Sequence, residues 1–119
     1  MYENLPIFKK ALELNVYVEE AVQNFSRYNK YAMGAELREK SRAVLYAIYQ
    51  NYFSINKSES LMLLRNSIEE LKISIYLANE LKVLRDFKQF ELLSKMAREL
   101  AKQAQGWLNS QNHTSSKGS

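Results

Sequence analysis

The chain contains no cysteine, a single proline and three glycines among its 119 residues. Without cysteine it can form neither a disulfide framework nor a thiolate metal site. Because turns and hairpins usually draw on proline and glycine, their scarcity argues against a sheet-rich fold. Leu, Ala, Glu, Lys and Arg are abundant instead, and all five are good helix formers. The composition therefore predicts an all-α protein.

Long apolar runs are also missing. No stretch approaches the roughly 20 apolar residues that a membrane span requires, and the N-terminus lacks a signal-peptide pattern. We therefore expect a cytoplasmic protein that does not associate with membranes.

Histidine is nearly absent, which removes several kinds of chemistry. The only one, His113, lies in the polar C-terminal segment. The helices therefore cannot supply the Glu-x-x-His pairs of a di-iron site or a histidine base for a nucleophile. A glycine-rich phosphate loop is missing as well. We expect no catalytic residue, no metal site and no cofactor, and hence a protein that is not an enzyme.

Four stretches carry apolar residues at alternating three- and four-residue steps, the pattern of packed amphipathic helices. In the first, Asn4 is the expected N-cap and Pro6 lies in the first turn, where its missing N–H is harmless. This helix should end near residues 26–29. The third should start at Asn56 and the fourth at Asp86, since each is followed three residues later by Glu or Gln, as in a capping box.

The second stretch should form a helix from residues 30–34 to residues 53–55. Gly34, near its start, is small enough to permit close approach of another segment. The expected core positions of this helix are Leu37, Ser41, Val44, Leu45, Ile48 and Tyr52.

The connections between the four predicted helices are short. Short connections make consecutive helices antiparallel neighbours, so we predict an up-down-up-down four-helix bundle over residues 1–109. Residues 110–119 are small, polar and aperiodic, and we expect them to form a disordered tail.

Basic residues recur along the predicted helices and give a net charge of +4. Lys88, Lys95 and Lys102 are spaced by seven residues with Arg98 beside the last two, while Glu91 and Glu99 should partly neutralise this ridge. Each such ridge alone is more often a solvated face, but several together favour a polyanion partner because phosphate contacts act additively. The residues expected to contact nucleic acid are Arg38, Arg42, Arg65, Lys72, Lys95, Arg98 and Lys102.

Eight tyrosines are many for this length. Tyr46 and Tyr49 follow Arg38 and Arg42 on one face of the second helix, and tyrosine is well suited to protein interfaces. We predict that these two tyrosines contact a protein partner; packing at the edge of the core is the alternative. Surplus apolar residues outside the core pattern favour self-association.

Four segments resemble a known family. They are Leu5-Pro-Ile-Phe-Lys-Lys-Ala-Leu-Glu-Leu14, the spacing of Gly34, Ser41, Leu45 and Ile48, the spacing of Leu63, Ile68 and Leu71, and the late pattern that runs from Lys95 to Lys102-x-x-x-Gly106-Trp-Leu108. The chain resembles the four-helix-bundle family of ribosomal-RNA intervening-sequence proteins. That branch continues its second helix with Asn-Ile-Ala-Glu-Gly, whereas this chain reads Ile48-Tyr-Gln-Asn-Tyr-Phe53. It is therefore more similar to the accessory variability determinants of diversity-generating retroelements.

The resemblance implies a function that periodicity does not. It implies a basic homopentamer that binds RNA and DNA without strong sequence preference. It further implies association with the reverse transcriptase of the same element, in support of mutagenic cDNA synthesis and retrohoming. The alternative is a helical protein–protein interaction module without nucleic-acid binding, in which the net charge serves solubility alone.

Overall fold

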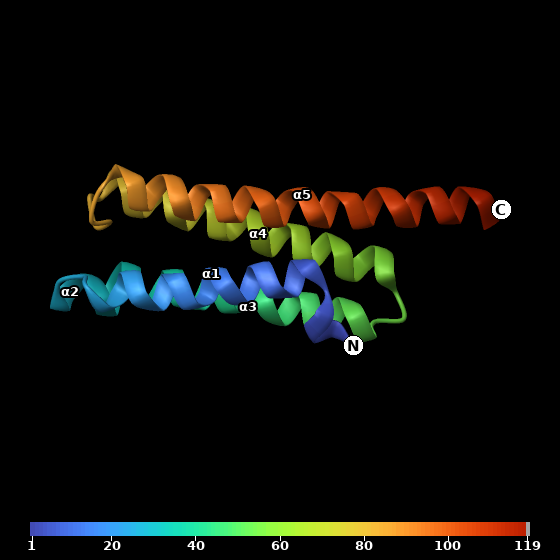
Figure 1. The fold of residues 1–119 in the computed structure, drawn as a ribbon, viewed down its shortest axis with the longest axis horizontal. Coiled ribbons are helices and arrows are strands. Elements are labelled where there is room, and N and C mark those ends of the chain that lie inside the picture. Colours follow the sequence, from blue (N-terminus) through green and yellow to red (C-terminus); the bar gives the residue numbers. More distant parts are fainter. Residues whose placement is uncertain (119) are drawn as a thin grey trace.

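Four long helices lie side by side in the computed structural model (Figure 1). The structure describes the backbone of residues 1–118 and the side chains of residues 1–110. The elements are a 3₁₀ turn η1 (Tyr2–Asn4), α1 (Pro6–Gln23), the short α2 (Arg27–Asn29), a π-helical turn η2 (Lys30–Gly34), α3 (Ala35–Phe53), α4 (Lys57–Glu80) and α5 (Phe87–Gly118).

The long helices alternate in direction along the chain (Figure 1). Helix α1 packs against α3 and α5, and α4 packs against the same two helices, so α3 and α5 occupy diagonal corners. The predicted antiparallel up-down-up-down bundle is confirmed. The expected disordered tail, residues 110–119, falls almost wholly on residues whose side chains lie outside those described, and it stays a prediction.

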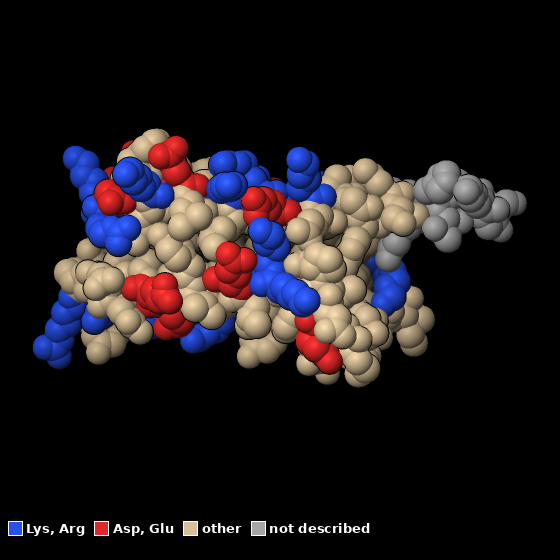
Figure 2. Space-filling view, viewed as in Figure 1, with Lys and Arg blue, Asp and Glu red and all other residues tan. Residues whose placement is uncertain are grey.

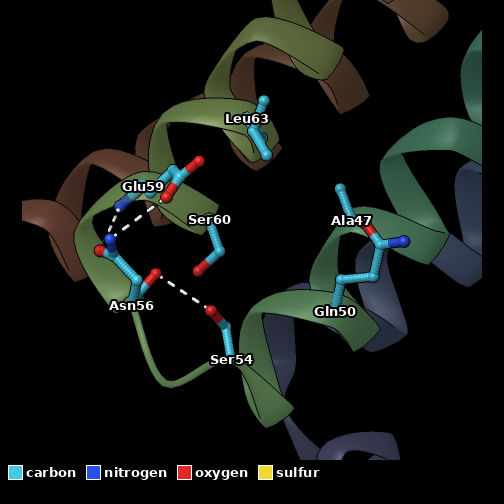
Figure 3. Close-up of a pocket in the computed structure, with 7 residues that line it drawn as sticks. All are labelled: Ala47, Gln50, Ser54, Asn56, Glu59, Ser60 and Leu63. Carbon is cyan, nitrogen blue, oxygen red and sulfur yellow. Dashed lines mark hydrogen bonds between the residues drawn. The ribbon is translucent and has the colours of Figure 1, made fainter.

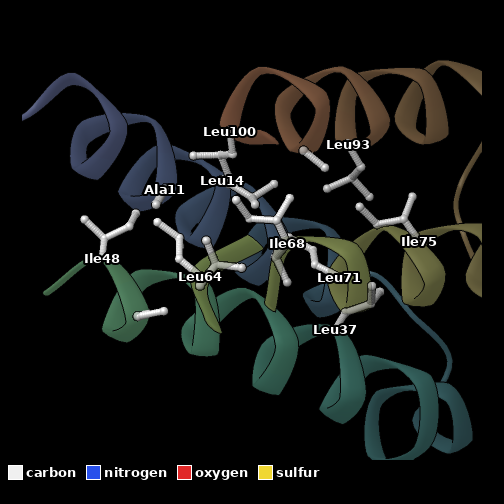
Figure 4. Close-up of a cluster of buried hydrophobic side chains, with 14 of the residues drawn as sticks. Ala11, Leu14, Leu37, Ile48, Leu64, Ile68, Leu71, Ile75, Leu93 and Leu100 are labelled. Carbon is white, nitrogen blue, oxygen red and sulfur yellow. The ribbon is translucent and has the colours of Figure 1, made fainter. Parts of the chain in front are cut away.

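Leucine and isoleucine side chains from all four helices fill the core (Figure 4). Of the core positions expected in the second helix, all but two are buried. Leu45 is partly buried, and Tyr52 is exposed, so that prediction was wrong for Tyr52. The reason is its position in the last turn of α3, at the end of the bundle, where its ring packs on the ring of Phe53. The largest fully buried side chains are Ile7, Leu14, Val18, Leu37, Ile48, Leu61, Leu64, Ile68, Leu71, Ile75, Leu93 and Leu100.

The capping residues predicted for the third and fourth helices are confirmed. Asn56 Oδ1 accepts the Glu59 amide hydrogen at 3.1 Å, and Asn56 Nδ2 donates to the Glu59 carboxylate at 3.2 Å. Asp86 Oδ1 accepts the Gln89 amide hydrogen at 2.8 Å, and this bond lowers the pKa of Asp86. The two caps fix where α4 and α5 begin, and with them the turns of the bundle.

The start of the first helix differs from the prediction. Asn4 ends the turn η1, and Leu5 is the N-cap of α1 without a side-chain hydrogen bond. Pro6 disfavours helical geometry in the residue before it, and Leu5 is accordingly extended, at φ −69° and ψ 134°. The helix therefore begins at the proline itself, which moves the cap one residue later.

Gly34 lies where η2 meets α3, against the end of α1. A Cβ at this position would lie 2.8 Å from Val22 Cγ1 and 3.1 Å from the Asn29 carbonyl oxygen. Val22 is fully buried and β-branched, so it cannot move aside easily. The close approach expected for this glycine is confirmed, and the contact is with the side chain of α1.

We predict that Gly34→Ala lowers the free energy of unfolding by about 1–3 kcal/mol, because the added methyl overpacks this contact. The matched control is Gly106→Ala in α5, where a Cβ would meet nothing within 4 Å. That change should stabilise by about 0.5–1 kcal/mol, since alanine favours helix. Urea unfolding of both variants measures the difference, and equal effects at the two positions would contradict the packing described here.

Candidate nucleic-acid interface

Six of the seven predicted cations fall into two groups, and the first group already has acidic partners. Arg38 Nε and Arg42 Nη2, one turn apart on α3, both reach the Glu19 carboxylate on α1, at 3.1 and 2.9 Å. Lys72 Nζ lies 3.1 Å from the Glu69 carboxylate within α4. These ion pairs offset the charge that the three residues would offer to a phosphate.

Arg65 belongs to neither arrangement. Its guanidinium Nη1 lies 3.9 Å from Met62 Sδ one turn earlier on α4, and its side chain is partly buried. The structure thus places Arg65 on α4, the helix of Lys72, which packs against both α3, where Arg38 and Arg42 lie, and α5.

The second group lies on one face of α5 and is exposed. We call Lys88, Lys95, Arg98 and Lys102 the α5 ridge. Among the described residues, no carboxylate lies within ion-pairing distance of any of the four. Figure 2 shows basic side chains recurring along the edge of the molecule over α5. The structure therefore brings together Lys95, Arg98 and Lys102 of the predicted set.

Glu99 was expected to neutralise part of this ridge, but its main partner lies on another helix. Lys10 Nζ of α1 is 3.0 Å from the Glu99 carboxylate. This hydrogen bond raises the pKa of Lys10 and lowers that of Glu99, with smaller contributions to Glu99 from Lys95 and Arg98. Because Lys10 pairs with Glu99 and adds a positive charge beside it, Glu99 neutralises little of the positive charge of the α5 ridge.

Beside the ridge, a groove of about 550 Å³ runs between α4 and α5. Three rings line it: Phe90 lies between Phe87, at 5.6 Å, and Tyr76, at 6.3 Å between ring centroids. Lys88, Lys95 and Arg98 line the same groove. The prediction from sequence missed this combination, because Tyr76 belongs to α4 and only packing shows which α5 residues it faces.

The tyrosines predicted to contact a protein lie elsewhere. Tyr46 and Tyr49 are both exposed on α3, diagonal to α5. The Tyr49 ring contacts those of Tyr2 and Phe53, each at 5.1 Å, within a cluster at the bundle end that holds both Tyr2 and Tyr52. The structure thus separates these tyrosines from the α5 ridge.

A smaller cleft, of about 280 Å³, lies between the end of α3 and the start of α4 (Figure 3). Its polar groups largely satisfy one another: Asn56 caps Glu59, and the Ser54 hydroxyl donates to the Asn56 carbonyl oxygen at 3.0 Å. We interpret this cleft as the capped turn of the bundle.

Among the side chains of residues 1–110, no group of three or more His, Cys, Asp or Glu is placed to hold a metal ion. In the same part of the chain, no helix combines the length and apolar character needed to cross a membrane.

No family model matches the chain, and neither does any curated protein. The family resemblance drawn from sequence therefore stays a prediction.

Proposed function

We propose that this chain is a non-catalytic, cytoplasmic accessory protein of a diversity-generating retroelement. In this role it binds RNA and DNA through the α5 ridge and associates with the reverse transcriptase of the same element. The observation that carries the proposal is the ridge itself: four exposed cations on one helix face, none paired with a carboxylate among the residues described.

Unpaired cations favour nucleic acid for a physical reason. Each phosphate that a lysine or arginine neutralises releases a condensed counterion, and these contributions add along the strand. Cations already held by carboxylates, such as Arg38 and Arg42 on Glu19, must first give up that interaction. The α5 ridge is therefore the part of the predicted surface best prepared to bind a polyanion.

Self-association is part of the proposal, with a homopentamer as the expected assembly. A groove of about 560 Å³ between α1 and α5 exposes Leu12, Val16 and Leu92. Exposed apolar surface of this kind is typical of interfaces. We assign the exposed face of α3 at Tyr46 and Tyr49 to the reverse transcriptase. This face lies diagonal to α5, so RNA bound on α5 would leave it accessible.

RNA binding at low salt tests the function. We expect the full chain to shift a labelled single-stranded RNA at micromolar protein in a gel, and to release it as salt increases. Light scattering on the same sample should give a mass several times that of one 13.9 kDa chain. A monomer that shifts no RNA at low salt would overturn the proposal.

A second candidate is a protein-interaction module without nucleic-acid binding. The aromatic cluster at the bundle end favours it, because Phe53 is exposed there beside Tyr2, and Ile55, two residues later in the chain, is exposed as well. The same gel shift separates the two functions, since this alternative predicts no RNA complex at any salt concentration.

A further inference from the structure

We infer that the α4–α5 groove binds single-stranded nucleic acid by stacking bases on Phe87 and Tyr76 while the ridge holds the phosphates. This inference rests on the proposed function and names its preferred substrate. The ridge alone would attract single and double strands alike, because both carry phosphates. Only unpaired bases can offer their faces to an aromatic ring.

The rings are placed to serve as a stacking surface. Phe87 is 63% exposed and Tyr76 is 48% exposed, although both lie against a folded helix pair. Partly buried Phe90 contacts both rings and supports them from the core side. The Phe87 and Tyr76 rings therefore rest on a partly buried residue while much of their surface stays open to solvent.

Three cations share the groove with these rings. Lys88, Lys95 and Arg98 line the same groove as Tyr76 and Phe87, and Glu91 is the one acidic residue among its lining residues. Proteins that bind single strands without sequence preference combine these two features, a basic track for the backbone and aromatic rings for the bases.

Phe87→Ala tests the inference in the full chain. By fluorescence anisotropy, we expect its affinity for a single-stranded RNA of about 20 nucleotides to fall roughly 5- to 150-fold, the range for the loss of one stacked base. Affinity for the matching duplex should stay within a factor of two, roughly, because duplex binding depends on phosphates. The salt dependence should not change, since no cation is removed.

Two further variants make the result specific. Phe87→Trp keeps a stacking face and should retain single-strand binding. Phe53→Ala removes a phenylalanine of similar exposure, 55%, from the opposite end of the bundle. This variant should bind single-stranded RNA as tightly as the unaltered chain. Thermal unfolding of each variant confirms that the bundle is intact.

The outcomes separate this inference from the function on which it rests. If the unaltered chain binds neither single strands nor duplexes, the proposed function fails, and the inference fails with it. Suppose instead that the chain binds RNA, but Phe87→Ala leaves its affinity for single strands unchanged or lowers its affinity for single strands and duplexes equally. The proposed function then stands, and the inference that bases stack in the groove is wrong.

Discussion

Replacing Lys95, Arg98 and Lys102 together with glutamine is expected to weaken single-stranded RNA binding on the order of 100-fold at about 50 mM salt. All three side chains are exposed on α5, and none has a carboxylate partner in the described part of the chain. Each therefore meets a phosphate without first breaking an ion pair. The salt dependence should also flatten, by a slope of roughly 0.7 for each phosphate that is no longer neutralised.

A matched variant isolates the role of these three cations. Substituting glutamine for Arg38, Arg42 and Lys72 removes the same total charge, but from residues that already pair with Glu19 and Glu69. We expect it to weaken binding several-fold less than the α5 variant. Equal effects of the two variants would mean that RNA responds to net charge alone, and that the α5 ridge has no special role.

The second large effect concerns stability. Leu64→Ala is expected to lower the free energy of unfolding by about 2–5 kcal/mol, because it removes a fully buried side chain and leaves a cavity. Leu64 lies on α4 within the core formed by all four helices (Figure 4). A change of this size is a large fraction of the total stability of a small domain.

The neighbouring residue provides the control. Leu63 is 57% exposed, whereas Leu64 is 0% exposed, and both lie in the same turn of α4. Leu63→Ala should change stability by no more than about 0.5 kcal/mol. Urea unfolding measures the stability of both variants, and an unchanged m-value shows that stability alone has changed. Similar destabilisation at both positions would show that α4 does not present the face to the core that is described here.

Sequence was sufficient to predict the bundle because its signals are local. The spacing of apolar residues identifies the core face of each helix, and the side chains of Asn56 and Asp86 mark two helix starts. The cap at Asn4 was wrong because Pro6 decides where α1 begins, and Tyr52 was wrong because periodicity does not show that a helix has reached the end of the core.

The candidate site was harder to predict, since charge along one helix does not reveal partners on another. Arg38 and Arg42 look as available as Lys95 in the sequence, yet Glu19 lies across from them on α1. Conversely, Lys10 forms an ion pair with Glu99, so this carboxylate does not pair with the cations of the α5 ridge. The groove could not be predicted at all, because its rings come from two helices whose relative register only packing determines.

The most direct test of the central claim is the salt dependence of RNA binding by the unaltered chain. If the four cations of the α5 ridge contact phosphates, log K for a single strand should fall against log salt with a slope of about −3 or steeper. Fluorescence anisotropy over a series of salt concentrations measures it. A slope near zero, or no binding at the lowest salt, would contradict an electrostatic nucleic-acid interface on α5.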